Sequence, residues 1–266
     1  MERRRVELGP VQETLLIPLH ARAAETRRRR PLTRDPRSVE LAGALDYDVS
    51  RIGGGLKLLG PVFRGVVLDD WVREFLAEHP SGTVVEIGAG LNTRYERVDN
   101  GTATWVEVDL PDVIALRREL FAEHARRRMV AGSAAEPDWA AAVAAAPGPY
   151  LFVSEAVLIY LTEAGARSAV DVIRDRFPGS VLLMDTVGSA EARRPRAVNV
   201  GWSCDDPREL AAWGLRLRDS RTLWDLPPQA RARLTPGRRV LSALLDRASR
   251  AGGSRLNRFD VGAPGA

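Results

Sequence analysis

Two apolar patterns alternate along the middle of the chain. Short continuous runs of β-branched, aliphatic and aromatic residues predict buried strands, and longer stretches with apolar residues three or four positions apart predict helices with one buried face. The strand-like runs are residues 83–87, 104–109, 129–131, 150–154 and 181–188. Because they alternate with helical stretches, we predict an α/β fold with a parallel sheet that helices cover on both faces.

The predicted helices fill the intervals between these runs. Residues 63–79 place Val67, Trp71, Phe75 and Leu76 at helical spacing. The other helices are expected at residues 111–128, at residues 138–146, and from Thr162, a suitable N-cap, to Phe177. Trp71, Trp105 and Trp139 are expected in the core.

The N-terminal part is organised differently. Residues 11–30 predict a helix with an apolar face and with Arg22 on another face; the apolar residues are Val11, Leu15, Leu16 and Leu19. Residues 31–61 predict short helices and irregular chain. Gly53–Gly55 is interpreted as a flexible linker, because no apolar strand precedes it and no GK[ST] follows it.

After residue 188 the regular alternation stops. Residues 189–207 are polar and a short helix follows them; strand-like stretches then occur at 215–223 and 255–262, with a helix near 240–245 between them. The two late strands predict an antiparallel hairpin at the sheet edge. We predict two parts, an N-terminal helical cap (1–62) and a core (63–266) with a substrate-side insertion at about 189–213.

The stretch from Thr83 to Asp109 carries the clearest chemical signal. The first strand ends in Gly88-Ala89-Gly90 and the second in Asp109. Glycines let the backbone approach a ligand closely, and an acid at a strand tip can accept hydrogen bonds from ribose hydroxyls. Thr93 stands where a dinucleotide site needs a third small residue, so the pattern favours a nucleotide-like ligand without phosphates.

Charge and composition add few constraints. The net charge is +4 and Lys57 is the only lysine. The run Arg27–Arg30 is interpreted as a solvated helix end, with a nucleic-acid site as the alternative. A single cysteine, Cys204, excludes an internal disulfide, and three scattered histidines show no metal-ligand spacing. No apolar run approaches the roughly 20 residues of a membrane helix, so we expect a soluble, cytoplasmic protein.

Several longer motifs are spread over nearly the whole chain. They are QETLLIPLHARA (12–23), RDP (34–36), LDYD (45–48), FRGVVLDD (63–70), VVEIGAGLNTR (84–94), WVEVDLP (105–111), SEAVLIYL (154–161) and RLNRFDVG (255–262). In this order they resemble the leucine carboxyl methyltransferase family, in particular its branch of tetracenomycin-type polyketide O-methyltransferases. The resemblance implies a class I S-adenosylmethionine-dependent methyltransferase with a Rossmann-like, seven-stranded, mostly parallel sheet.

The resemblance also implies a cofactor site. By the family's pattern Arg64 would bind the carboxylate of S-adenosylmethionine, Asp109 the ribose hydroxyls, and Glu155 would face the cofactor near the acceptor. The full set is Arg64, Glu86, Gly88, Ala89, Gly90, Asp109, Leu110, Ser133, Ala134 and Glu155. The residue types suit these roles, because an arginine fork pairs bidentately with a carboxylate and a carboxylate attracts a sulfonium.

Two positions depart from the family's usual residues. Asn92 stands where the family usually has Asp, and Ser133-Ala134 stands where it usually has an acid followed by leucine. The family's acid would hold the adenine amino group, and a serine hydroxyl does so more weakly.

The predicted acceptor is a small acidic molecule. A carboxylate is already ionised at neutral pH and needs no general base, whereas a phenol with a pKa of about 10 benefits from one. His20 and Tyr160 are the catalytic candidates, and substrate contacts are expected from Tyr160, Trp202, Trp213 and Arg94, with an internal salt bridge as the alternative for Arg94. We predict O-methylation of a carboxylate or acidic hydroxyl on a polyketide-like metabolite, without a metal and without a nucleic-acid or membrane partner.

Two other function classes stay open at this point. The departures at Asn92 and Ser133 also suit a catalytically silent S-adenosylmethionine binder that acts as a scaffold or regulator. The run Arg27–Arg30 suits a basic nucleic-acid-binding protein.

Overall fold

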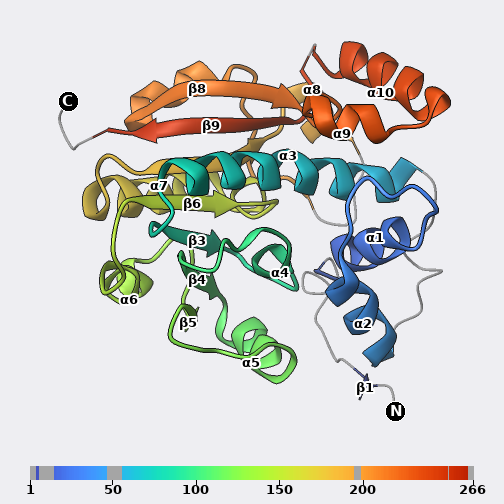
Figure 1. Cartoon of the computed structure of the whole chain (residues 1–266). Helices are drawn as coiled ribbons and strands as arrows, with labels where there is room; N and C mark the ends of the chain where they lie inside the picture. The colour runs from blue at the N-terminus through green and yellow to red at the C-terminus, as the bar shows by residue number, and fades with distance from the viewer. Residues whose placement is uncertain (1–3, 6–14, 47–55, 195–198, 251, 263–266) are drawn as a thin grey trace.

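The sheet at the centre of the molecule has seven strands in the order β5-β4-β3-β6-β7-β9-β8. The fold is that of a computed structural model, which describes residues 4–5, 15–46, 56–194, 199–250 and 252–262 (Figure 1). The strands from β5 to β7 pair in parallel, and β9 pairs antiparallel with both β7 and β8. The predicted α/β fold with a mostly parallel sheet and an antiparallel C-terminal pair is confirmed.

The parallel strands form where the short apolar runs predict them. They are β3 (Thr83–Ile87), β4 (Thr104–Asp109), β5 (Arg127–Ala131), β6 (Tyr150–Ser154) and β7 (Val181–Thr186). Every residue of β3 is buried, as expected for a central strand. Ile87 pairs with Val108 and with Ser154, so the turns that follow β3, β4 and β6 emerge together at one edge of the sheet.

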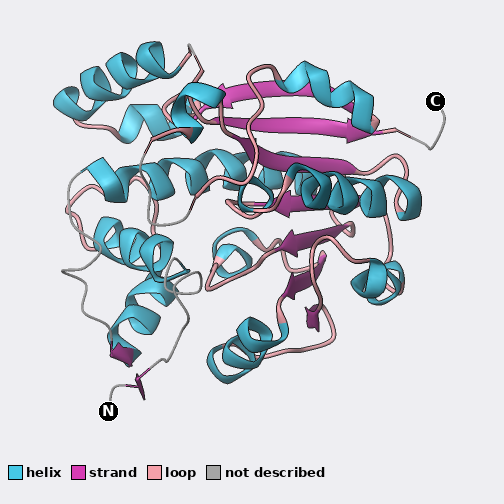
Figure 2. Ribbon diagram, turned by 180° about the vertical axis from the view of Figure 1, so that it is seen from behind, coloured by secondary structure: helices cyan, strands magenta, loops and turns pink. Residues whose placement is uncertain are grey.

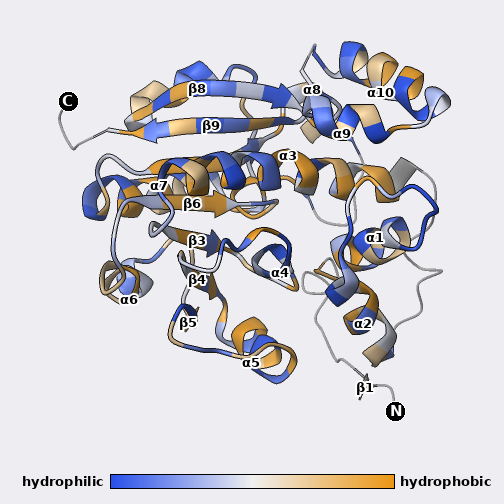
Figure 3. Cartoon of the chain, viewed as in Figure 1, coloured by the Kyte–Doolittle hydropathy of each residue, from blue (hydrophilic) through white to orange (hydrophobic). Residues whose placement is uncertain are grey.

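The C-terminal pair is antiparallel but is not a simple hairpin. β8 (Leu215–Thr222) and β9 (Arg255–Val261) are separated in sequence by α9 (Pro228–Arg233) and α10 (Pro236–Ser249). β9 takes the inner position, where Leu256 and Phe259 are buried. β8 is the edge strand and is largely hydrophilic in Figure 3, whereas β6 is apolar along its length. Charged side chains on an edge strand discourage pairing with other chains.

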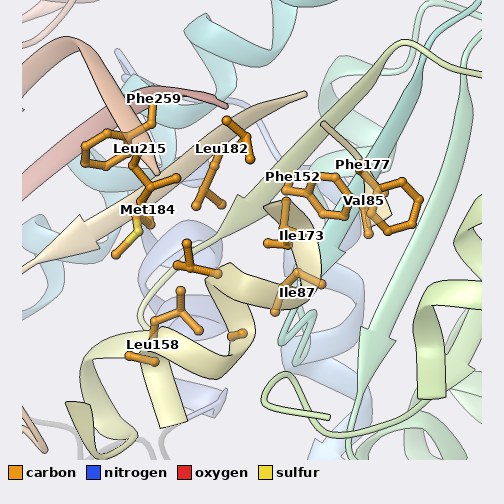
Figure 4. Close-up of a cluster of buried hydrophobic side chains, with 14 of the residues drawn as sticks. Val85, Ile87, Phe152, Leu158, Ile173, Phe177, Leu182, Met184, Leu215 and Phe259 are labelled. Atoms are coloured by element: carbon orange, nitrogen blue, oxygen red, sulfur yellow. The ribbon is translucent and has the colours of Figure 1, made fainter. Parts of the chain in front are cut away.

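Helices cover both faces of the sheet (Figure 2). α3 (Leu56–Glu78) packs its buried residues against Val84, Trp105 and Leu151 on one face. α6 (Ala140–Ala144) and α7 (Glu163–Arg176) cover the other face, where Val85 and Ile87 meet a cluster that includes Phe152, Ile173 and Phe177 (Figure 4). Neighbouring residues of one strand thus serve opposite faces, as the pleat requires. Trp71, Trp105 and Trp139 are buried, as predicted.

Several predicted helix boundaries are wrong, among them the end of the helix predicted at 11–30, which lies at Thr26 instead of residue 30. α3 begins at Leu56 instead of residue 63 and contains Pro61, so it crosses the predicted border between cap and core at residue 62. α5 (Pro111–Leu120) ends before the arginines at 126–128, because Arg127 belongs to β5 and pairs there with buried Glu107. Residues 137–144 form a 3-10 turn followed by α6 instead of one helix. The other short helices are α4 (Arg94–Val98), α8 (Ser189–Ala192) and the 3-10 turns at Leu158–Tyr160 and Pro207–Trp213.

The N-terminal cap lies beyond the carboxyl ends of the parallel strands (Figure 1). It contains α1 (Leu16–Thr26), α2 (Pro36–Ala44) and the short parallel pair β1 (Arg4–Arg5) and β2 (Leu45–Asp46). Arg27–Arg30 follow α1 as exposed residues. Val11 and Gly53–Gly55, which the sequence assigns to a helix face and to a linker, lie outside the described residues. The division into cap and core stays a prediction.

One correction in the cap bears on the site. Arg22, predicted on a face away from the apolar residues, is 3% exposed. Its Nε donates to Asp35 at 3.0 Å, and its Nη2 donates to the carbonyl of Leu91, in the turn after β3, at 3.0 Å. A charged side chain tolerates burial when it is paired and hydrogen-bonded in this way. The cap is therefore joined directly to the turn that follows the central strand.

Within the ranges given above, no helix is long and apolar enough to cross a membrane. The same ranges hold no group of three or more His, Cys, Asp or Glu side chains that could bind a metal ion.

We predict that Asp35 anchors this cap. Its carboxylate is completely buried and accepts hydrogen bonds from Arg22, Thr93, Arg97 and the backbone of Ser38. Asp35→Asn leaves buried Arg22 without its carboxylate partner, so the free energy of unfolding in urea should fall by about 3–5 kcal/mol. In the control Asp138→Asn, at an exposed position, the change should stay within about 0.5 kcal/mol. Equal stability of the two variants would contradict this role of Asp35.

Candidate active site

A cavity of about 220 Å³ opens at the edge of the sheet where β3 and β6 end, beneath the cap. Open parallel sheets bind ligands at this edge. A larger groove on the outer side of α3 lies away from the strand ends, so we place the site in the smaller cavity. Its described lining residues come from α1 and the residue before it, from α3, and from the turns after β3 and β6. They are Leu15, Ile17, Pro18, Arg22, Pro61, Arg64, Gly88–Asn92, Glu155–Val157 and Tyr160.

The glycine turn after β3 forms the floor of this cavity. Gly88 has a φ of 69°, and a Cβ there would lie 2.2 Å from Val157. Gly90 has a φ of 47°, and a Cβ there would lie 2.8 Å from Leu15. Both the backbone conformation and the close approach exclude larger residues. The backbone N–H of Gly88 donates to the carbonyl of Val108, which fixes the turn against β4.

Asp109 lies beside this turn at the end of β4. Its carboxylate accepts hydrogen bonds from the backbone N–H groups of Gly90 and Leu110, each at 2.7 Å. Burial raises the pKa of Asp109 above its ordinary value, although these two bonds oppose the rise. Leu110 is 45% exposed next to it. A carboxylate held beside a glycine turn suits the recognition of ribose hydroxyls. Asp109 itself is not among the described residues that line the cavity.

Glu155 follows β6, and its side chain is 7% exposed. One oxygen accepts from Nε of Arg64 at 2.9 Å, and the other accepts from Nη2 of Arg94 at 2.5 Å. Burial alone would raise the pKa of Glu155, but Arg64, Arg94 and Arg22 outweigh it and lower the pKa to about 2. Ala156 next to it has a φ of 55°, an unusual value for a residue with a Cβ. This carboxylate is therefore held in one place and stays ionised at any physiological pH.

Arg94 was a candidate for contact with an acidic substrate, and the structure places it elsewhere. It is 1% exposed and its guanidinium pairs with Asp69, Glu86 and Glu155. Together these carboxylates outweigh the effect of burial and raise the pKa of Arg94. Arg94 thus forms an internal salt bridge, which is the alternative that the sequence allowed. Glu86, predicted to bind the cofactor, is buried behind the turn, and burial raises its pKa.

The other predicted residues divide between cavity and core. Tyr160 lines the cavity. Trp202 and Trp213 contact each other in the core, with ring centroids 5.2 Å apart, and Trp202 Nε1 donates to the carbonyl of Leu158. We therefore no longer assign them to substrate binding. His20 is buried in α1 outside the described lining. Ser133 and Ala134 lie past the end of β5, where the backbone of Gly132 donates to the carbonyl of Asp109, and they are also outside that lining.

Sequence reasoning missed several residues of this site. Ile17, Pro18, Pro61 and Val157 supply its apolar walls. All but Pro61 lie in a quoted motif, but no periodicity marks them as cavity residues. Asp185, at the end of β7, is buried 3.9 Å from Arg64 and could have been found by the same signal as Asp109, an acid at a strand tip.

Comparison with known proteins identifies the family. A model described as leucine carboxyl methyltransferase matches residues 16–174. The chain is 35% identical over 240 residues to the tetracenomycin polyketide synthesis O-methyltransferase TcmP of Streptomyces glaucescens, which covers 86% of this chain and 88% of that protein. The chain belongs to the leucine carboxyl methyltransferase family. The family resemblance noted in the sequence is thus confirmed.

A more distant relative has the same cofactor dependence, and a solved structure has the same fold. An S-adenosyl-L-methionine-dependent methyltransferase, dpfgK of Gibberella zeae, is 26% identical over 252 residues, which cover 82% of this chain and 84% of that protein. A crystal structure described as a methyltransferase of Thermobifida fusca superposes with a TM-score of 0.56 at 22% identity, covering 91% of this chain and 94% of that one, and it shows the same fold. The predicted enzyme class, an S-adenosylmethionine-dependent O-methyltransferase, is confirmed.

The residues around the cavity fit this cofactor. Gly88 and Gly90 line the cavity and contribute only backbone atoms to its wall, and a Cβ at either position would collide with Val157 or Leu15. Arg64 offers a fork for a carboxylate, Glu155 a fixed negative charge for an ammonium or sulfonium, and Asp109 an acceptor for ribose hydroxyls. The assignment of each residue to a part of the cofactor stays a prediction.

We predict that Asp109→Asn weakens binding of S-adenosylhomocysteine by about 10–100-fold, because hydrogen bonds to a charged group contribute about 1.5–3 kcal/mol each. Since the pKa of Asp109 is raised and that of Glu155 is about 2, acidification below neutral pH should protonate Asp109 before Glu155 and weaken binding. Titration calorimetry across this pH range measures both effects.

The Asp109→Asn variant should lose the part of this pH dependence that comes from Asp109, and exposed Asp138→Asn should keep both the affinity and the full pH dependence of the original protein. Original affinity in Asp109→Asn would mean that the ribose lies elsewhere.

Proposed function

We propose that this enzyme transfers the methyl group of S-adenosylmethionine to a carboxylate oxygen of a small, largely apolar acid. The observation that carries the proposal is the composition of the cavity wall. Among the lining residues that the structure describes, none is a histidine, and the only acid is Glu155, which two arginines hold ionised. A carboxylate acceptor needs no base, whereas an ordinary phenol at neutral pH needs one.

The charges of the wall also favour an anionic acceptor. Arg64 and Arg22 both line the cavity. With Arg64 assigned to the carboxylate of the cofactor, Arg22 is the cation that the cap presents to the acceptor. Burial and neighbouring Arg97 lower the pKa of Arg22 to about 10, so it stays protonated at neutral pH. We assign the acceptor carboxylate to the Arg22 side of the cavity, between the cap and Tyr160.

The apolar walls indicate the rest of the acceptor. Leu15, Ile17, Pro18, Pro61 and Val157 come from the cap, from α3 and from the turn after β6. These surfaces suit a flat or aromatic body better than a polar one. The relative TcmP acts in tetracenomycin polyketide synthesis. We therefore propose an aromatic polyketide-type acid as the natural acceptor.

In this proposal the protein acts mainly by position and by excluding water. Its cofactor supplies an electrophilic methyl group, and displacement at that carbon requires the acceptor oxygen in line behind it. Residues of the cap close the cavity above the strand ends, and Arg22 orients the acceptor oxygen toward the glycine turn. Such alignment accounts for up to roughly 7–11 kcal/mol of a barrier.

The test is the chemical nature of the product. The enzyme is incubated with labelled S-adenosylmethionine and matched pairs of aromatic acids and phenols, and products are followed by mass spectrometry. We expect a methyl ester that mild alkali hydrolyses, formed at a rate that does not rise between about pH 6 and 9. An alkali-stable methyl ether, formed at a rate that rises toward the pKa of the phenol, would contradict the carboxylate proposal.

A further inference from the structure

Arg94 joins three elements of the site through three carboxylates. Its Nε donates to Asp69 of α3 at 2.8 Å, its Nη1 to Glu86 of β3 at 2.5 Å, and its Nη2 to Glu155 after β6 at 2.5 Å. Its side chain is fully buried, so water does not compete for these bonds. Each of its three nitrogen atoms therefore has a carboxylate partner on a different element.

The two sides of Glu155 are not equivalent in this arrangement. Arg64, on the cavity side, takes one oxygen, and Arg94, behind the cavity wall, takes the other. If Arg64 turned from Glu155 toward the carboxylate of the cofactor, Glu155 would lose part of its support on the cavity side. Arg94 would then remain as its fixed partner.

Through Asp69, Arg94 also holds the helix that carries Arg64. Both residues belong to α3, and Asp69 also accepts from Arg97 of α4 at 2.7 Å. The pair Arg94–Asp69 therefore fixes α3, and with it the backbone of Arg64, against the turn after β3. One guanidinium thus sets the positions of the two groups assigned to the amino-acid end of the cofactor.

We propose that Arg94 is a positioning residue for the amino-acid end of S-adenosylmethionine, acting through Glu155 and Asp69 without touching the cofactor. The proposal rests on the assignment of that end to Arg64 and Glu155. Lysine keeps the charge but offers one nitrogen in place of a planar fork, so it cannot hold all three carboxylates at these distances.

The test compares two ligands in the variant Arg94→Lys. S-Adenosylhomocysteine carries the amino-acid end, whereas 5′-methylthioadenosine has the same adenosine and sulfur without it. We expect calorimetric affinity for S-adenosylhomocysteine to fall by about tenfold or more and affinity for 5′-methylthioadenosine to stay within about twofold. A general structural effect would weaken both ligands alike, so equal losses, or no loss in a folded variant, would overturn the proposal.

A second variant and two controls complete the test. If Arg94→Lys does not fold, the test uses Asp69→Asn, because this variant removes a contact of Arg94 and leaves Glu155 intact. A selective loss of affinity for S-adenosylhomocysteine again supports the proposal, and equal losses for both ligands overturn it. Arg127→Lys changes another buried, paired arginine outside the cavity wall and should leave both affinities unchanged. If Arg64→Lys binds S-adenosylhomocysteine normally, the assignment of the amino-acid end to Arg64 is itself wrong. That result is distinguishable from a failure of the role proposed for Arg94.

Discussion

The active site depends on the pairing of buried charges at the carboxyl end of the sheet. An unpaired charge in such a place is very unfavourable, so each buried carboxylate requires a cation and each arginine requires acceptors. Glu155 has Arg64 and Arg94, and Asp69 has Arg94 and Arg97. Since these partners come from α3, α4 and the turn after β6, the pairing fixes the elements relative to one another.

The same network connects the cap to the cofactor side. Arg97 joins Asp69 to Asp35, and Asp35 in turn holds Arg22 of α1. Arg22 also binds the backbone of the glycine turn. The surface that we assign to the acceptor and the turn that we assign to the cofactor therefore share one rigid frame, which is what an in-line transfer between the two requires.

Asn92 has a physical explanation in this frame. Its amide nitrogen lies 3.3 Å from a Glu86 oxygen and 3.4 Å from a Glu155 oxygen, and its carbonyl oxygen accepts from Arg97. An aspartate, the family's usual residue, would place a third carboxylate beside the other two. The amide donates to both of them instead, so this departure suits the local charges of the chain.

The sequence predicted the sheet well, because strand signals are local. Buried runs such as 83–87 and acids at strand ends such as Asp109 and Glu155 are visible within a few residues. The burial of Arg22 and Arg94 was not predictable in this way, since charged residues are usually exposed and the partner carbonyl of Arg22 is 69 positions away. For the converse reason, Trp202 and Trp213 were wrongly predicted to contact the substrate. Their neighbours in sequence are polar, although both side chains belong to the core.

The most direct test of this account is a crystal structure of the protein with S-adenosylhomocysteine. The ribose hydroxyls should lie within hydrogen-bonding distance of Asp109, the carboxylate of the ligand should lie on Arg64, and Glu155 should still pair with Arg94. A ligand whose amino-acid end lies away from Arg64 and Glu155, or a Glu155 released from Arg94, would contradict it.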